Sequence, residues 1–157
     1  MFNLSHVTIS SIYDTPSRLL SSSMARLMNR TFEDPHGETI TVLESFYRIV
    51  RSVKSRGGKV IVSDMFRTHE AQEVAHERKP KLVAPPGRSH HEAGLAFDIW
   101  IGGLALSYEV FAALVHAHGW ETGAAWKKSE PWHIQLPYAR LGFRSLAEAI
   151  EFVGNGG

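Results

Sequence analysis

Two histidines and one aspartate stand in two short segments of this chain, in a combination that suits a metal ion. The first segment, residues 89–98, reads Ser-His-His-Glu-Ala-Gly-Leu-Ala-Phe-Asp and contains His91 and Asp98. The second segment, residues 130–133, reads Glu-Pro-Trp-His and ends on His133. Two imidazoles and one carboxylate are a ligand set that suits zinc and leaves a fourth position open for water. The three residues therefore predict a catalytic zinc site.

A further carboxylate, Glu130, stands close before the last of these ligands and is followed directly by a proline. A residue that precedes proline is restricted to extended backbone, so Pro131 favours a strand entry from which the Glu130 carboxylate leans over the metal without binding it. A carboxylate in that position can act as a general base toward water. A zinc site beside such a base indicates a hydrolase.

The ligands must converge from different elements, and the pattern around them allows this. Side chains alternate between the two faces of a strand, so Asp98 shares its face with Ala96 and Trp100. The small side chain of Ala96 leaves room for an ion. His133, if it also lies in a strand, shares its face with Gln135. The metal is therefore expected beside a sheet.

Both segments resemble motifs of a known family. The motif Ser-x-His-x-x-Gly-x-Ala-x-Asp is matched by Ser89, His91, Gly94, Ala96 and Asp98, and the motif Glu-x-Trp-His by Glu130, Trp132 and His133. Upstream, residues 63–68 resemble the family's strand-end segment, with Arg67 in the place of its active-site arginine. In that segment Asp64 and Met65 replace the small and aromatic residues that are usual there.

The family that these motifs resemble is that of the D-Ala-D-Ala carboxypeptidases and dipeptidases. These are zinc peptidases of the VanY and VanX types, also called LAS peptidases, and they are related in fold to the hedgehog signalling domain. The likeness runs from about residue 59 to residue 136. It implies an α+β fold: a small antiparallel sheet with flanking helices and a zinc cleft on the open face of the sheet.

The resemblance also implies roles for individual residues. One zinc ion would be bound by His91, Asp98 and His133. Glu130 would take a proton from water and later give it to the leaving amine. Arg67 would stabilise the developing oxyanion or hold the substrate's carboxylate, because its charge is fixed and its donors form a planar fork.

Two further residues of the motifs are expected to contact the substrate. Ser89 would either hydrogen-bond the substrate or orient a metal ligand, and both alternatives remain open. Trp132 belongs to the second motif and is expected to line the cleft, with Trp126 as a further candidate. The two remaining tryptophans, Trp100 and Trp120, are expected in the core.

The function that the resemblance implies is zinc-dependent hydrolysis of bacterial cell-wall peptides. We expect a D-Ala-D-Ala carboxypeptidase acting on the peptidoglycan stem peptide or another peptide that ends in D-Ala-D-Ala. One alternative is a lysin-type endopeptidase, an endolysin, that cuts inside the stem peptide or the cross-bridge. The other is a non-catalytic zinc-binding module, against which Glu130 and Arg67 both argue, since a binding module needs neither a base nor a cationic clamp.

Bulk composition fits a globular domain and excludes several other classes. The 157 residues are 43% hydrophobic and 21% charged, which fits one globular domain. Together with the family resemblance, this implies a single zinc peptidase domain over residues 1–157. A net charge of +1 with no basic stripe gives no reason to expect nucleic acid. The absence of cysteine excludes disulfides and thiolate metal sites. No apolar run is long enough for a transmembrane helix. We also expect the protein to be a monomer.

The first residues lack the basic start and long apolar stretch of a signal peptide. Peptidoglycan lies outside the cytoplasm, so three interpretations stay open. The chain is a phage-type lysin released by another protein, it acts on cytoplasmic dipeptides or recycled wall peptides, or a leader has been removed.

Hydrophobic spacing, caps and β-branched runs predict the order of elements. Helices are expected from Thr15-Pro16 up to the break at Pro35-His36-Gly37, from about Glu38 to Arg56, from the cap Thr68 to about Arg78, from the cap Ser107 to Gly119, and after a capping box at Ser145–Glu148. Strands are expected at Lys59–Ser63, Leu95–Trp100, Trp120–Thr122 and Trp132–Leu136, with a proline-rich loop at Lys79–Arg88.

Overall fold

The computed structural model describes residues 22–64, 66–102, 107–124, 126 and 129–154. The α-helices in these ranges are α3 (Ser22–Met28), α4 (Val42–Lys54), α5 (His69–Arg78), α6 (Tyr108–Ala117) and α7 (Leu146–Phe152), and the 3₁₀ helices are η1 (His90–Ala93) and η2 (Tyr138–Leu141). The strands are β1 (Thr31–Glu33), β2 (Thr39–Thr41), β3 (Lys59–Asp64), β4 (Ala96–Gly102), β5 (Glu121–Gly123) and β6 (Glu130–Gln135). Both classes of element share one chain, as an α+β fold requires.

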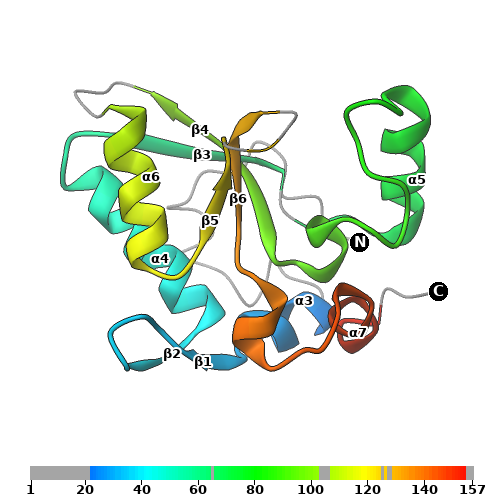
Figure 1. The fold of residues 1–157 in the computed structure, drawn as a ribbon, viewed down its shortest axis with the longest axis horizontal. Helices are drawn as coiled ribbons and strands as arrows, with labels where there is room; N and C mark the ends of the chain where they lie inside the picture. Colours follow the sequence, from blue (N-terminus) through cyan, green and yellow to red (C-terminus); the bar gives the residue numbers. More distant parts are fainter. Residues whose placement is uncertain (1–21, 65, 103–106, 125, 127–128, 155–157) are drawn as a thin grey trace.

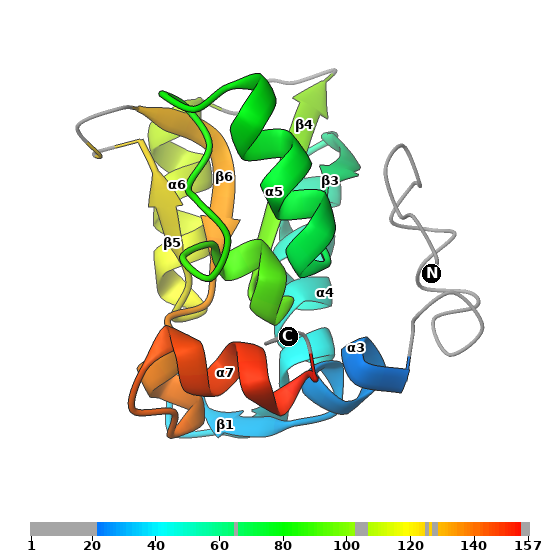
Figure 2. The same cartoon turned by 90° about the vertical axis from the view of Figure 1, so that its right-hand side faces the viewer.

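A four-stranded antiparallel sheet in the order β3-β4-β6-β5 forms the centre of the molecule. Helices α4 and α6 cover one face of this sheet, whereas α5 and the loop after it stand on the other side (Figure 1). The view turned by 90° places α5 in front of the strands and α4 and α6 behind them (Figure 2). The prediction of a small antiparallel sheet with flanking helices is confirmed.

Apolar side chains from α4, α6 and the sheet form one buried cluster. In it the rings of Phe46 and Phe97 stack with centroids 3.9 Å apart. Trp120 packs against both rings, and its indole Nε1 donates a hydrogen bond to Ser45 Oγ at 2.8 Å. The prediction that Trp120 lies in the core is confirmed, whereas the side chain of Trp100 lies outside the described structure.

Two of the predicted helix starts are confirmed in detail. Thr68 caps α5, because its Oγ1 accepts a hydrogen bond from Ala71 N at 3.0 Å. Ser107 caps α6 in the same way through Val110 N at 3.3 Å. The four predicted strands are present as β3, β4, β5 and β6, and β6 begins two residues earlier than expected, at Glu130. No helix in the described parts of the chain could span a membrane.

The predicted boundary between the first two helices was wrong. Helix α3 ends at Met28, and a two-stranded hairpin of β1 and β2 occupies the expected helix end and start. The turn forms because Asp34 Oδ1 accepts hydrogen bonds from the backbone amides of His36 and Glu38, both at 2.9 Å, and Gly37 takes a positive φ of 82°. The expected helix start at Thr15-Pro16 lies outside the described residues.

The start of the second helix moves for the same reason. Helix α4 begins at Val42, with Thr41 as its N-cap, so Glu38 belongs to the hairpin and not to the helix. At α7 the predicted capping box is only half formed. Ser145 Oγ accepts from Glu148 N at 3.1 Å, but the Glu148 carboxylate accepts from the amide of Arg144.

Candidate metal centre

Asp98 and His133 are placed by the register of two neighbouring strands. Strand β4 pairs with β6 so that Asp98 stands directly opposite His133, and Ala96 stands opposite Gln135. Directly opposed residues in an antiparallel pair present their side chains on one face at close range. The distance from Asp98 Oδ1 to His133 Nδ1 is accordingly 3.2 Å.

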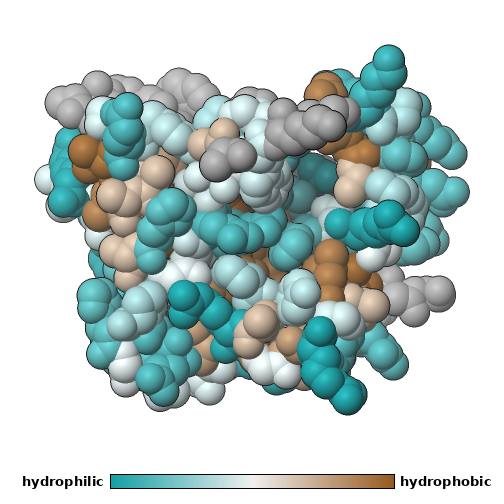
Figure 3. Space-filling view, viewed as in Figure 1, coloured by the Kyte–Doolittle hydropathy of each residue, from teal (hydrophilic) through white to brown (hydrophobic). Residues whose placement is uncertain are grey.

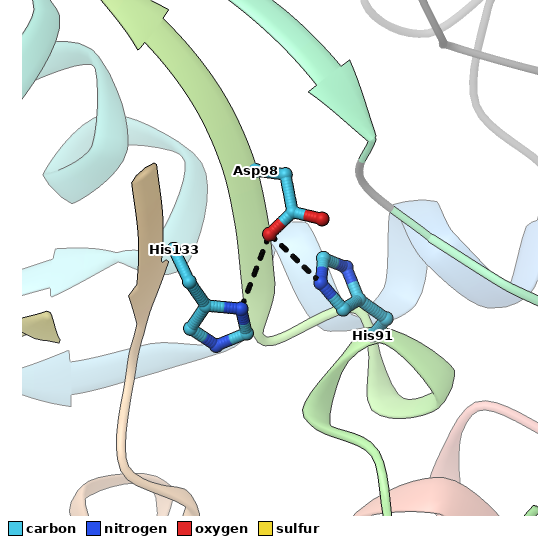
Figure 4. A group of neighbouring side chains, drawn as sticks. All are labelled: His91, Asp98 and His133. Atoms are coloured by element: carbon cyan, nitrogen blue, oxygen red, sulfur yellow. Dashed lines mark hydrogen bonds and ion pairs between the residues drawn. The ribbon is translucent and has the colours of Figure 1, made fainter. Parts of the chain in front are cut away.

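His91 reaches the same point from the short helix η1. Gly94 ends η1 in the left-handed conformation, with φ of 71°, which a residue with a side chain rarely adopts. The chain then turns directly into β4. His91 Nε2 lies 3.3 Å from Asp98 Oδ1. Figure 4 shows the two imidazoles approaching the same carboxylate oxygen, one from η1 and one from β6.

The three side chains fit a zinc ion. Ligand atoms at about 2.0–2.1 Å from a tetrahedral zinc lie about 3.3 Å from one another. The separations of 3.2 Å and 3.3 Å to Asp98 Oδ1 agree with that spacing, and one ligand atom from each of His91, Asp98 and His133 lies within 4.8 Å of the others. The structure therefore brings together the three residues that the sequence predicted as ligands.

The charges of the centre favour an ionised carboxylate. Burial alone would raise the pKa of Asp98, but its interactions with His133 and His91 hold it well below its usual range. Burial alone would lower the pKa of His133, but its bonds to Asp98 and Gln135 raise it. Burial and the neighbouring imidazoles lower the pKa of His90 to about 4, so His90 is neutral at pH 7.

Glu130 lies at the edge of the ligand group. It opens β6, as the following proline predicted, and its Oε2 lies 3.9 Å from His133 Nδ1. The carboxylate is partly exposed and lines the pocket that contains the three ligands. It is thus close enough to reach a water molecule at the metal position while lying outside the three-residue ligand group.

The ligands lie in a pocket of about 540 Å³ between the sheet and the segment from α5 to η1. Its lining residues outside the ligand set are Arg67, Gln72, Lys79, Leu82, Val83, Ala84, Arg88, Ser89, His90, Trp126, Glu130 and Gln135. Figure 3 shows the face on which the surface is hollowed between the sheet and α5, with hydrophilic residues bordering the hollow.

Arg67 lies beside the ligands, where its guanidinium contacts both walls of the pocket. Its Nη2 is 3.4 Å from Asp98 Oδ2, and its Nη1 donates to Gln72 Oε1 at 3.0 Å. Gln72 is fully buried and donates in turn to the carbonyl of Ala84 at 2.7 Å. Arg67 therefore lies in the pocket with the predicted ligands, and its role toward a substrate stays a prediction. Gln72 was not predicted, because one helical turn into α5 it reads as an ordinary polar residue.

Ser89 contacts the backbone of His91, one of the three predicted ligands. Its Oγ accepts a hydrogen bond from the amide of His91 at 3.2 Å, which supports the alternative that Ser89 orients a ligand. The side chain of Trp132 lies outside the described structure, so its predicted contact with substrate stays a prediction. Trp126 lines the pocket instead, with its ring centroid 4.9 Å from that of His133.

Glu92 was missed by sequence reasoning, although it is fully buried beside His91. Its carboxylate accepts hydrogen bonds from the amides of Gly87 at 2.9 Å and Ser89 at 3.2 Å, and it lies 3.2 Å from His69 Nδ1. With Ser89 it forms a complete capping box at η1. The spacing Ser-x-x-Glu in this segment was the available signal.

Comparisons with known proteins support the fold. No protein-family model matches this chain, and no curated protein matches its sequence. A glutamate-to-alanine mutant of the vancomycin resistance D,D-pentapeptidase VanY, from a VanB-type resistance cassette and in complex with Zn(II), is a similar solved structure. It shares 20% identity, covers 84% of this chain and 88% of that chain, and has a TM-score of 0.52.

A second similar structure is that of the LD-carboxypeptidase LdcB. It shares 20% identity, covers 69% of this chain and 65% of that chain, and has a TM-score of 0.50. Identity at this level shows the fold alone. The chain therefore has the fold of these two peptidases, as the sequence resemblance implied.

Proposed function

We propose that this chain is a zinc-dependent peptidase that hydrolyses bacterial cell-wall peptides, and that it removes a terminal D-Ala from the peptidoglycan stem peptide. The observation that carries the proposal is the geometry of the centre. Asp98 Oδ1 lies 3.2 Å from His133 Nδ1 and 3.3 Å from His91 Nε2, the spacing of ligands on a tetrahedral zinc ion, and the Glu130 carboxylate lies at the edge of this group. A site that served only to stabilise the fold would be closed by a fourth protein ligand.

The fold and the motifs support the same class of substrate. One similar structure is a D,D-pentapeptidase in complex with Zn(II), and the other is an LD-carboxypeptidase that recognises peptidoglycan. The residues that match the family's motifs are the ones that converge in the pocket, including His91, Asp98 and His133. Convergence of matched residues is a stronger argument than similarity of fold, because a fold alone does not fix function.

The chain's own residues account for the proton transfers of amide hydrolysis. A zinc ion, when bound, supplies a Lewis acid that polarises the scissile carbonyl and acidifies water. Glu130 takes a proton from the attacking water as the water oxygen bonds to the carbonyl carbon. The carbon–nitrogen bond then breaks, and Glu130 returns the proton to the leaving amine.

Arg67 is suited to hold the substrate's terminal carboxylate or the developing oxyanion. Its guanidinium lines the pocket, and its contacts with Gln72 and Asp98 fix its orientation. A fixed planar fork of donors matches a carboxylate better than a mobile ammonium does. A carboxypeptidase needs such a group because its substrate ends in a free carboxylate.

Mass spectrometry of digested peptidoglycan tests the proposal. Pentapeptide-containing peptidoglycan is treated with the zinc-loaded protein and, separately, with the Glu130→Gln variant. Loss of one terminal D-Ala from each stem that depends on Glu130 would establish a carboxypeptidase. Intact stem termini with split cross-linked dimers, or stems released from glycan, would instead make the protein a lysin-type endopeptidase.

The Glu130→Gln variant also tests the assignment of the base. We expect it to retain stoichiometric zinc and to lose activity by at least about a hundredfold, the low end of general-base contributions. Zinc content by metal analysis and turnover on the same preparation separate the two effects. Turnover close to that of the wild type would remove Glu130 from the mechanism.

A further inference from the structure

Both ring nitrogens of His133 are engaged, each toward a different partner. Nδ1 faces Asp98 Oδ1 at 3.2 Å, and Nε2 faces Gln135 Oε1 at 2.9 Å. The amide nitrogen of Gln135 donates to the carboxylate of Glu121. Glu121 stands directly opposite Gln135 across the pairing of β5 with β6. A chain of hydrogen bonds therefore runs from Glu121 through Gln135 to the ring of His133.

The chemistry of these groups gives the chain a direction. Gln135 presents its NH₂ group to Glu121, because its amide nitrogen is the donor to the carboxylate oxygen. The carbonyl oxygen of Gln135 then faces His133 and can only accept. His133 must therefore carry a proton on Nε2, and in the neutral ring this leaves the lone pair on Nδ1.

The free lone pair lies on the side of the metal centre. Nδ1 is the atom of His133 that lies 3.2 Å from Asp98 Oδ1, the oxygen that His91 Nε2 also approaches. Asp98 is itself an acceptor and would favour a proton on Nδ1, which would block a metal ion there. Gln135 offers the competing acceptor at Nε2, so the two contacts favour opposite tautomers of the same ring.

We propose that Glu121 and Gln135 are positioning residues that hold the proton of His133 on Nε2 and thereby keep Nδ1 available to the metal. The inference rests on the zinc site of the proposed function. Gln135 is buried, with 5% of its surface exposed, so water does not readily replace its carbonyl. Partners of this kind behind a metal-bound histidine typically change metal affinity by about 10- to 100-fold when they are removed.

Zinc affinity measured by competition with a chelator tests this relay, the chain of hydrogen bonds from Glu121 through Gln135 to His133, in four variants. Gln135→Leu keeps the volume but removes the acceptor, and we expect the zinc dissociation constant to rise by about 10- to 100-fold. Glu121→Leu removes the group that orients the Gln135 amide and should also weaken binding. Glu121→Gln should stay near the wild type, because its amide oxygen can still accept from Gln135. Ser45→Ala is the matched control, since it removes another buried acceptor, from Trp120, away from the pocket.

The outcomes separate this inference from the proposed function. A wild-type protein that binds no zinc would overturn the zinc site itself. A wild type that binds zinc together with a Gln135→Leu variant that binds it equally well would overturn only the relay. Equal weakening in Glu121→Leu and Glu121→Gln, or in Ser45→Ala and Gln135→Leu, would also overturn it, because a general loss of stability would then explain the effect.

A second measurement does not depend on affinity. Two-bond proton–nitrogen NMR correlations of the zinc-bound protein identify which ring nitrogen of His133 carries the proton. We expect a slowly exchanging Nε2 proton in the wild type and in Glu121→Gln, and faster exchange in Gln135→Leu. A slowly exchanging Nε2 proton in Gln135→Leu, or a wild-type ring protonated on Nδ1, would overturn the inference.

Discussion

The metal centre has two halves that are positioned in different ways. The sheet half consists of Asp98 and His133, which face each other across the pairing of β4 with β6. The loop half consists of η1, which carries His91, together with the loop of residues 79–88 that leads to it. The sheet half is fixed by a backbone ladder that continues on both sides, because β4 also pairs with β3 and β6 with β5.

The loop half depends on a few local hydrogen bonds. Ser89 Oγ holds the amide of His91, and the buried Glu92 carboxylate holds the amides of Gly87 and Ser89. Arg67 N donates to the carbonyl of His91 at 3.0 Å and links this segment to the end of β3. Loss of any one of these bonds would free part of the segment, whereas a strand in a ladder is held by several backbone hydrogen bonds at once. Asp98 and His133 are therefore positioned by many backbone hydrogen bonds, whereas the position of His91 depends on a few.

The two halves also differ in what else they carry. The sheet half carries Glu130 at the start of β6 and the hydrogen bonds from His133 to Gln135 and Glu121, so under the proposed mechanism changes there would affect both metal binding and proton transfer. The loop half carries the wall of the pocket from Lys79 to Arg88. A change in the loop half can therefore alter substrate binding while the backbone of the sheet stays in place.

Removal of a sheet ligand should have the largest effect on the metal. We expect His133→Ala to lose stoichiometric zinc, because His91 and Asp98 alone leave too few protein ligands to hold the ion. Zinc content after gel filtration, measured by metal analysis, checks this. His116→Ala, an exposed histidine of α6, serves as the control and should keep its zinc. Stoichiometric zinc retained in His133→Ala would overturn the ligand assignment.

The candidate ligands could be identified in the sequence because their signal is local. Residue types, the adjacent Pro131 and the alternation of a strand are all readable within ten residues, and so the strands that carry Asp98 and His133 could be predicted. The direct opposition of Asp98 and His133 could not be read in the same way. Their register depends on pairing between strands that are separated by α6 and β5.

Three features could not be predicted as readily: Gln72, the β1–β2 hairpin and the buried Glu92. They depend on contacts that are distant in the sequence, or their local sequence is compatible with more than one structure. Gln72 acquires its role only because α5 stands beside the loop that carries Ala84. The β1–β2 hairpin is hard to predict because Pro35 is compatible with a helix break as well as with a turn, although Asp34 and Gly37 both favour a tight turn. Glu92 has a readable local signal, the capping box, but its burial is not predictable, because carboxylates are rarely buried.

Weakening the loop half should have an intermediate effect. Glu92→Gln leaves one neutral amide oxygen where the carboxylate offers two charged oxygens, so the amides of Gly87 and Ser89 lose a charged acceptor and Gly87 loses one of its two oxygen partners. We expect the zinc dissociation constant to rise by about tenfold, with ligands intact. Glu148→Gln is the control, because Glu148 accepts a backbone hydrogen bond beside Ser145 in α7. Unchanged zinc affinity in Glu92→Gln would show that the loop half does not depend on this carboxylate.

Removal of the metal should have the smallest effect and should separate the halves most clearly. On chelation of zinc we expect the amides of Gly94 and Leu95, which bond carbonyls of His91 and His90, to exchange with solvent about fivefold faster, equivalent to about 1 kcal/mol of local stability. The backbone amide of Phe97 should change less, because β4 keeps its pairing with β6, where Phe97 stands opposite Ile134.

Hydrogen exchange followed residue by residue, with and without zinc, measures this difference. The loop half would lose one of its few links to the sheet when the metal leaves, since His91 would share a bound ion with Asp98 and His133. In the sheet half, the strands that carry Asp98 and His133 stay joined by backbone hydrogen bonds without the ion. An equal increase at η1 and β4 would mean that zinc stabilises the domain as one cooperative unit. The two halves would then differ in their contacts but not in their stability, and the dependence on local bonds inferred for the loop half would be wrong.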